Sequence, residues 1–151
     1  MGERLYYPRW FELYELLPPE VFSYDDMMQK EKHLQQGWAL LDTKLLETID
    51  VIRDIIGYPL ICNTWYQDGS RRYSGYRTIG CTTGAAKSQH KLGKAVDLIC
   101  PKMSAEDMRQ KIIANQDRLP YPIRIEDGVT WLHIDTKDMN YKGEKIYFFK
   151  A

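Results

Sequence analysis

Residues 130–135 read Thr130-Trp131-Leu132-His133-Ile134-Asp135, and the rest of the predicted fold is arranged around this stretch. Two apolar side chains, Leu132 and Ile134, alternate with residues of mixed character. Successive side chains of a β-strand point to opposite faces, so the alternation predicts a strand that turns Leu132 and Ile134 into the core. Trp131, His133 and Asp135 then share the other face, where we expect His133 to be exposed.

Further strands are predicted before and after this one. The turn residues Asp127-Gly128 separate it from a strand over Pro122–Glu126, and residues 140–143 separate it from a strand over Lys145–Phe149. Earlier in the chain, the β-prone runs Pro59–Trp65 and Ala95–Ile99 predict two more buried strands. A glycine- and arginine-rich loop is expected between them, from Gln67 to Ser88.

Helices are predicted mainly ahead of the sheet. Apolar residues recur every three or four positions from Trp38 to Ile56, which is typical of an amphipathic helix, and Gly57 is placed to end it. A shorter helix is expected around Trp10–Leu17, and another from Ser104 to about Ala114, where Ser104 and Asp107 resemble a capping box. Helices followed by a small, largely antiparallel sheet indicate the α+β class.

Length and composition fit one domain over residues 1–151. At 44% hydrophobic residues the chain has enough apolar surface to form a core without a partner. We expect residues 1–37 to be an N-terminal extension packed on the body and residues 38–151 to be the catalytic core. Residues 27–36 fit neither a helix nor a strand pattern clearly.

The charge balance limits the classes of partner that the chain is expected to bind, and the first residues indicate where it is made. Twenty-one basic residues offset twenty-one acidic ones, so we expect neither a nucleic acid nor a membrane as partner, and we expect a monomer. The first twenty residues carry charges and no long apolar run, which predicts synthesis in the cytoplasm without a signal peptide. Cys62, Cys81 and Cys100 form no CxxC pair; we expect Cys62 and Cys100 to be buried in strands and Cys81 to be more exposed.

Two of the three histidines stand in a pattern that suits a metal. The segment SQHKLGKAVD, residues 88–97, puts His90 in a loop and Asp97 seven residues later in a predicted strand. Gly93 between them would let the chain turn without a Cβ clash, so both side chains could face one point. With His133 this makes two imidazoles and one carboxylate, a set that binds catalytic zinc and leaves a fourth position for water.

Spacing alone leaves a plainer interpretation open. His90 could be a loop histidine, His133 a satisfied core histidine and Asp97 a turn or cap residue. There is no HExxH helix, and such dispersed ligands often arise by chance. The remaining histidine, His33, lies in a charged segment outside every motif and is expected to be solvated.

The motifs Ser74-Gly75-Tyr76-Arg77, SQHKLGKAVD and WLHID together resemble the zinc D-alanyl-D-alanine carboxypeptidase family. That family includes phage L-alanyl-D-glutamate endopeptidases and shares its fold with hedgehog signalling domains. The resemblance covers roughly residues 38–149, and SxHxxGxAxD is a specific signature. It implies a hedgehog-like fold, one Zn²⁺ ion held by His90, Asp97 and His133, and peptidoglycan stem peptide as substrate.

The resemblance also implies roles for other residues. A carboxylate just before the last histidine is the general base, for which Glu126 and Asp127 are the candidates; we favour Glu126 because Asp127 beside Gly128 is typical of a turn. Arg77 is expected to contact substrate or the developing oxyanion, unless it is a surface arginine. Ser88 is expected to support the ligand loop or touch substrate. Asp135 could orient a ligand imidazole or be a plain strand charge.

The expected reaction is peptide hydrolysis by zinc-activated water, with Glu126 moving the proton and no covalent enzyme intermediate. Whether the enzyme would be a carboxypeptidase at D-Ala-D-Ala or an endopeptidase stays open. By analogy it could be a phage endolysin or virion enzyme that reaches the cell wall when released or delivered. The alternative is a catalytically inactive, metal-stabilised module for cell-wall binding or phage structure.

Overall fold

The computed structural model describes residues 5–22, 36–85 and 87–151. Its centre is a four-stranded sheet in the order β1-β3-β2-β4, made of β1 (Ala95–Leu98), β2 (Ile123–Glu126), β3 (Leu132–Asp135) and β4 (Ile146–Phe149). β3 is antiparallel to β1 and β2, and β4 is parallel to β2. The predicted α+β class is confirmed, and these four strands occur with bounds shortened by one or two residues.

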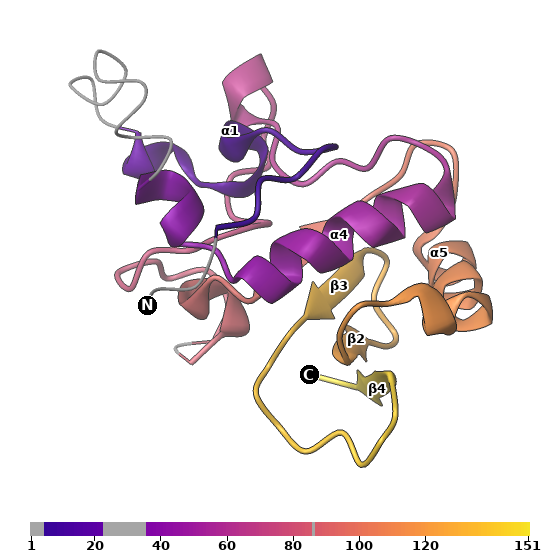
Figure 1. Ribbon diagram of the computed structural model, residues 1–151. Helices are drawn as coiled ribbons and strands as arrows, with labels where there is room; N and C mark the ends of the chain where they lie inside the picture. The colour runs from indigo at the N-terminus through magenta and orange to yellow at the C-terminus, as the bar shows by residue number, and fades with distance from the viewer. Residues whose placement is uncertain (1–4, 23–35, 86) are drawn as a thin grey trace.

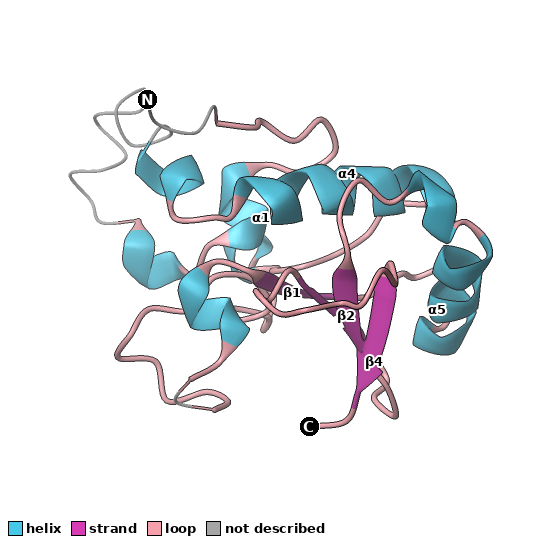
Figure 2. Cartoon of the chain, turned by 60° about the horizontal axis from the view of Figure 1, so that its bottom comes forward, coloured by secondary structure: helices cyan, strands magenta, loops and turns pink. Residues whose placement is uncertain are grey.

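Two helices pack with the sheet around one core. The long helix α4 (Thr43–Ile56) runs across the sheet, and α5 (Ala105–Ala114) lies beside it (Figures 1 and 2). The alternation of β3 is as predicted, since Leu132 and Ile134 are fully buried in the same apolar cluster as Ile52 of α4. The opposite face of the sheet is therefore free to carry polar side chains.

The start of α4 differs from the prediction. The apolar stripe suggested a helix from Trp38, but α4 begins at Thr43, because Asp42 is extended and its side chain caps the helix by accepting a hydrogen bond from the backbone N–H of Lys44. Residues 36–39 are helical but separate from α4. The predicted end is confirmed: Gly57 has a φ of 82° and closes the helix in the left-handed conformation.

The predicted strand over Pro59–Trp65 is wrong. Only Ile61 pairs in this segment, in an isolated bridge with Ile99. The backbone N–H of Asn63 donates instead to the carbonyl of Glu15, and its side chain bonds the carbonyl of Leu17, so the segment is tied to the N-terminal region rather than to the sheet. Cys62 is buried as expected but is not in a strand.

Two further expectations change with the packing. Cys100 is half-buried just after β1, not buried within a strand, and Cys81 has the same intermediate exposure. His133 is 7% exposed, so the prediction of an exposed histidine on β3 is wrong. The rings of His90 and Phe149 pack against this residue, and the strand alternation alone does not reveal them.

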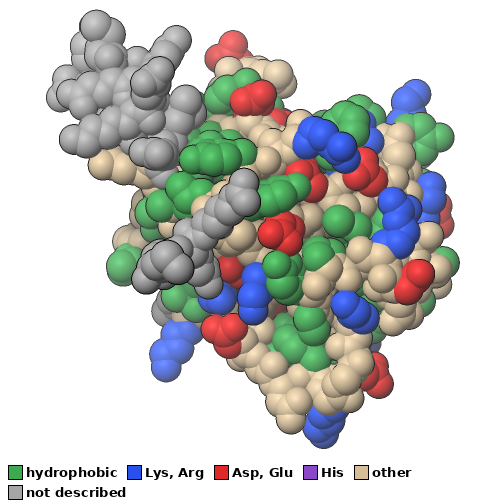
Figure 3. Space-filling model, viewed as in Figure 1, with side chains coloured by type: hydrophobic (Ala, Val, Ile, Leu, Met, Phe, Trp, Pro, Cys, Tyr) green, Lys and Arg blue, Asp and Glu red, His purple; other side chains and the backbone are tan. Residues whose placement is uncertain are grey.

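The N-terminal segment contributes to the core. The short helix α1 (Leu13–Leu16) occupies the middle of the helix predicted over Trp10–Leu17, and Leu16 and Leu17 are fully buried. Asp50 of α4 accepts hydrogen bonds from the hydroxyl of Tyr6 and from the backbone of residues 9 and 10, which fastens this segment to the helix. Hydrophobic side chains also gather on this face of the molecule (Figure 3).

Some of the residues considered in the sequence lie outside the described ranges. His33 and residues 27–35, for which no clear pattern was found, lie outside the described residues. Within the described parts of the chain, no helix has the length and apolar character needed to cross a membrane.

Candidate metal centre

Three elements bring His90, Asp97 and His133 together. His90 lies in the 3-10 turn η3 (Gln89–Leu92), Asp97 in β1 and His133 in β3, where the antiparallel register pairs Asp97 directly with His133. The turn that carries His90 ends at Gly93, whose φ of 71° and close approach to the carbonyl of Leu40 leave no room for a side chain. The hydroxyl of Ser88 caps the start of the same turn by accepting from the His90 backbone N–H at 3.2 Å.

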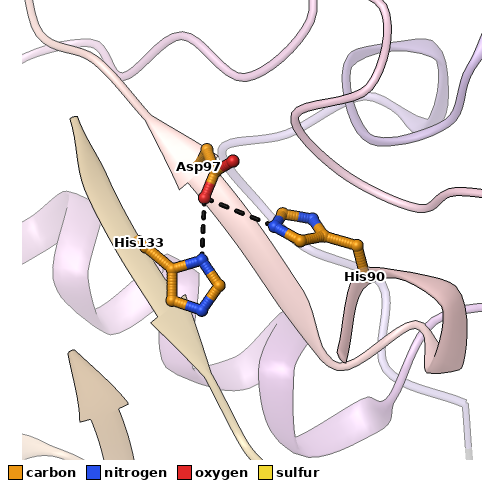
Figure 4. A group of neighbouring side chains, drawn as sticks. All are labelled: His90, Asp97 and His133. Atoms are coloured by element: carbon orange, nitrogen blue, oxygen red, sulfur yellow. Dashed lines mark hydrogen bonds and ion pairs between the residues drawn. The ribbon is translucent and has the colours of Figure 1, made fainter. Parts of the chain in front are cut away.

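The three side chains converge on one point. The Oδ1 atom of Asp97 lies 2.8 Å from Nδ1 of His133 and 3.4 Å from Nε2 of His90 (Figure 4). One ligand atom from each residue lies within 4.8 Å of the other two, so the group could hold a metal ion. The sequence motif and the fold select the same three residues.

The other nitrogen of each imidazole has a hydrogen-bond acceptor. Nδ1 of His90 lies 2.9 Å from the carbonyl oxygen of Gly75, and Nε2 of His133 lies 2.8 Å from Oδ2 of Asp135. Because a carbonyl or carboxylate can only accept, each of these nitrogens carries the proton. The other two nitrogens, Nε2 of His90 and Nδ1 of His133, face Asp97 and are the ones that a metal would use. Without an ion, Nδ1 of His133 also carries a proton, because it too faces a carboxylate.

The electrostatics of the group without an ion agree with this geometry. Burial by itself would raise the pKa of Asp97, but hydrogen bonds from His133 and His90 outweigh it and hold that pKa well below its usual range. Burial would lower the pKa of His133, yet its bonds to Asp135 and Asp97 raise it to about 9. A proton on His133 therefore occupies the position that a cation would take.

Asp135 is more than a strand charge. It is fully buried and forms a two-pronged pair with Arg124, at 2.8 Å from each nitrogen, while also bonding His133. The guanidinium of Arg124 lies over the ring of Phe149, 3.9 Å from its centroid, and that ring packs edge-on against His133. Arg124 therefore pairs with the buried Asp135 carboxylate, while Asp135 and Phe149 contact the imidazole itself.

Of the two candidate bases, the structure places Glu126 beside the metal group. The register that pairs Ile125 with Ile134 puts Glu126 next to His133, and its Oε2 lies 4.0 Å from Nδ1 of that histidine. Asp127 is exposed, and its carboxylate accepts from the backbone N–H of Gly128, as expected of a turn residue.

Arg77 lies beside the same group, and its side chain already contacts two other residues. Its Nε donates to the carbonyl of Tyr73 at 2.7 Å, and a terminal nitrogen lies 3.5 Å from Oδ2 of Asp97. The side chain is about 10% exposed, so it is not a free surface arginine. It holds the Asp97 oxygen that faces away from His133.

A hollow of about 320 Å³ opens over this group. Its walls include the three candidate ligands together with Arg77, Ser88, Glu126 and Asp135. Sequence reasoning missed three contributors to this region: Gly75, Arg124 and Phe149. Alternation along β2 could have found Arg124, since it shares a face with Glu126, but its pairing with Asp135 depends on the strand register.

Comparison with known proteins gives one match. The family model described as peptidase M15 matches residues 20–135, which include all three candidate ligands and Glu126. The match begins before residue 38, where the motifs suggested that the resemblance starts. A search of curated proteins and a search of solved structures found no match.

Proposed function

Because the chain belongs to the peptidase M15 family, whose members are metallopeptidases, we propose that it is a zinc-dependent peptidase that cuts a peptide bond in bacterial peptidoglycan. The observation that carries the proposal is the meeting of Glu126 with the His90, Asp97 and His133 group in one hollow. A carboxylate beside a nitrogen and oxygen ligand set is the arrangement that metal-assisted hydrolysis needs.

The residues that would hold zinc are His90 through Nε2, His133 through Nδ1 and Asp97 through its carboxylate. When bound, the ion would polarise the scissile carbonyl and lower the pKa of water towards neutrality. The donor set fits, because one nitrogen of each imidazole faces the Asp97 carboxylate, and a bound cation would replace the proton that Nδ1 of His133 donates to it.

Glu126 is the proposed general base. Its carboxylate takes a proton from the attacking water and then delivers it to the leaving amine, so that no covalent enzyme intermediate forms. The side chain is 13% exposed and borders the hollow, which lets it reach the water and the scissile bond. Arg77 is proposed to stabilise negative charge on the carbonyl oxygen while it holds Asp97 in place.

Substrate, delivery and the exact bond are part of the proposal. The substrate class, a stem peptide cut as a D-Ala-D-Ala carboxypeptidase or as an endopeptidase, is supported by the family alone. Action on the cell wall requires that the protein be released from the cell or delivered by a virion, as an endolysin or phage enzyme would be.

The decisive experiment compares Glu126→Gln with Asp127→Asn as a matched control. Zinc content and newly released amino groups are measured after incubation with purified peptidoglycan. We expect Glu126→Gln to keep one zinc per chain and to lose at least about 100-fold in rate, the range for a general base, and Asp127→Asn to retain its rate. Full activity of Glu126→Gln would contradict the assignment, and wild-type protein that binds the wall without releasing amino groups would support the inactive module.

A further inference from the structure

The lining of the hollow over the metal group includes four cationic side chains, from two arginines and two lysines, against the three carboxylates of Asp97, Glu126 and Asp135. Arg77 pairs with Asp97 and Arg124 pairs with Asp135. Lys87 and Lys137 also border the hollow, and neither forms a salt bridge with a carboxylate among the described residues. A metal ion would add to this excess, so the hollow favours a substrate that brings negative charge.

The lining of a second hollow includes one of these lysines. Its cavity volume is about 350 Å³, within the range of about 300–1,000 Å³ that is usual for small-ligand sites. Lys137 borders both hollows, and the second one also contains Lys44, Tyr121 and Tyr141. We name the second one the Lys44–Lys137 hollow. A peptide held across the metal group could extend into it.

The backbone around Lys137 is fixed by hydrogen bonds, whereas its ammonium group forms no ion pair within the described parts of the chain. The Lys137 backbone N–H donates to Oδ1 of Asp135 at 3.2 Å, and the hydroxyl of Tyr141 donates to its carbonyl at 2.7 Å. The preceding residue, Thr136, bonds the Asp42 side chain and the backbone of Lys94. The lysine therefore starts from a fixed position next to the metal group, which lowers the entropy cost of binding.

The other charged groups of this hollow fit an anionic ligand. The ammonium of Lys44 lies over the ring of Tyr121, 5.5 Å from its centroid, and among the described residues no carboxylate is paired with it. Asp138 also borders the hollow, but its carboxylate pairs with Lys94 at 3.4 Å. Arg77 was the expected carboxylate ligand, yet its Nε and one terminal nitrogen already serve Tyr73 and Asp97, so its two-pronged fork is not free.

We propose that the Lys44–Lys137 hollow binds a carboxylate of the peptide substrate on one side of the scissile bond. The inference rests on the proposed function and adds a substrate requirement to it. In a stem peptide this carboxylate can be the free C-terminus or the one that a glutamate residue leaves free within the chain. Both present the same chemistry to Lys137 and Lys44, and amidation removes the negative charge of either.

The test measures binding apart from cleavage. Zinc-loaded Glu126→Gln protein is titrated calorimetrically with three synthetic stem peptides: one with both carboxylates free, one amidated only at the C-terminus and one amidated only at the internal carboxylate. The same titrations are made with Lys137→Gln and Lys44→Gln in that background. Lys102→Gln, an exposed lysine in the turn before α5 that borders neither hollow, is the matched control.

We expect one of the two amidations to weaken binding about five- to tenfold, as for loss of a partly enclosed charged hydrogen bond. Lys137→Gln should cause a similar loss with the peptide carrying both free carboxylates and no further loss with the peptide whose relevant carboxylate is amidated. The sensitive amidation identifies the source of the carboxylate. Lysine variants that bind all three peptides as the control does would overturn the proposal.

The outcomes separate this inference from the proposed function. Carboxylate-dependent binding with no cleavage by the wild-type protein would support the subsite and contradict the peptidase assignment. Cleavage by the wild type that is indifferent to both amidations and to both lysines would do the reverse. Failure of the Glu126→Gln protein to bind any of the peptides would overturn the subsite.

Discussion

Replacing Asp135 by Asn tests whether the metal group depends on its buried hydrogen-bond network. The wild-type carboxylate accepts from His133, from two nitrogens of Arg124 and from the Lys137 backbone. An amide has one accepting oxygen, so its NH₂ group must face either Nε of Arg124 and the Lys137 backbone N–H, or the other Arg124 nitrogen and Nε2 of His133. If it faces His133, it favours the tautomer with the proton on Nδ1, which removes the lone pair aimed at the metal.

Asp135→Asn should lower both the metal affinity and the stability of the fold. Metal affinity should fall about 10- to 100-fold, the usual effect of removing such a hydrogen-bond acceptor behind a ligand. The free energy of unfolding should fall by about 3 kcal/mol, because Arg124 loses its buried partner. Its side chain is 14% exposed and keeps its contact with Phe149, which favours the lower end of that range.

Zinc affinity is measured by competition with a fluorescent chelator, and stability by urea unfolding of the metal-free protein. Arg124→Met is the matched control, since it removes the cation but leaves Asp135 bonded to His133. It should lower stability while changing zinc affinity less than about threefold, below the range for loss of a direct ligand-orienting group. An Asp135→Asn protein that is destabilised but binds zinc as tightly as the wild type would refute the reasoning and leave Asp135 as a structural charge.

Three further predictions concern stability and ligand placement. In metal-free protein the pKa of His133 is raised to about 9, against an unfolded value near 6.5. The protonated histidine therefore stabilises the fold fully below pH 6.5, by at most about 3 kcal/mol, and this contribution is lost as the pH rises through 9. Equal free energies of unfolding in urea at pH 6 and pH 9.5 would contradict the prediction. Gly75→Ala would drive a methyl group into the carbonyl of Leu16 and displace the Gly75 carbonyl that holds His90, so we expect the free energy of unfolding to fall by about 1–3 kcal/mol and zinc binding to weaken. Gly80→Ala is the control, because its methyl group would meet nothing within 4 Å and stability should stay near wild type. Equal effects of the two substitutions would count against the argument. Asp50→Ala removes a buried acceptor of three hydrogen bonds, so the free energy of unfolding should fall by about 2–3 kcal/mol and proteolysis near residues 6–10 should be faster. An unchanged rate of cleavage there would show that the segment is held by its leucines alone.

Much of the fold followed from local pattern. The alternation at 130–135, the helix cap at Ser104 and the stop at Gly57 can each be recognised within a few residues of sequence. In the structure the strand occurs over 132–135, the Ser104 side chain accepts from the backbone N–H of Asp107, and Gly57 ends α4. The strand over 59–65 failed because its apolar run says only that the segment is buried. Its hydrogen bonds go to Glu15 and Leu17, more than forty residues earlier in the chain, and no local pattern encodes that choice.

In the candidate site, too, some features can be read from the sequence and others only from the tertiary structure. The sequence by itself selected His90, Asp97 and His133, because ligand chemistry limits the residue types and the motif fixes their spacing. The sequence also favoured Glu126 over Asp127 as the base, but only the tertiary structure placed Glu126 beside His133 and gave Asp135 its partners. Those relations depend on strand register, since a shift of one residue would turn every side chain of β2 to the other face. Register is set by how the whole core packs, so it could not be read from residues 122–135 alone.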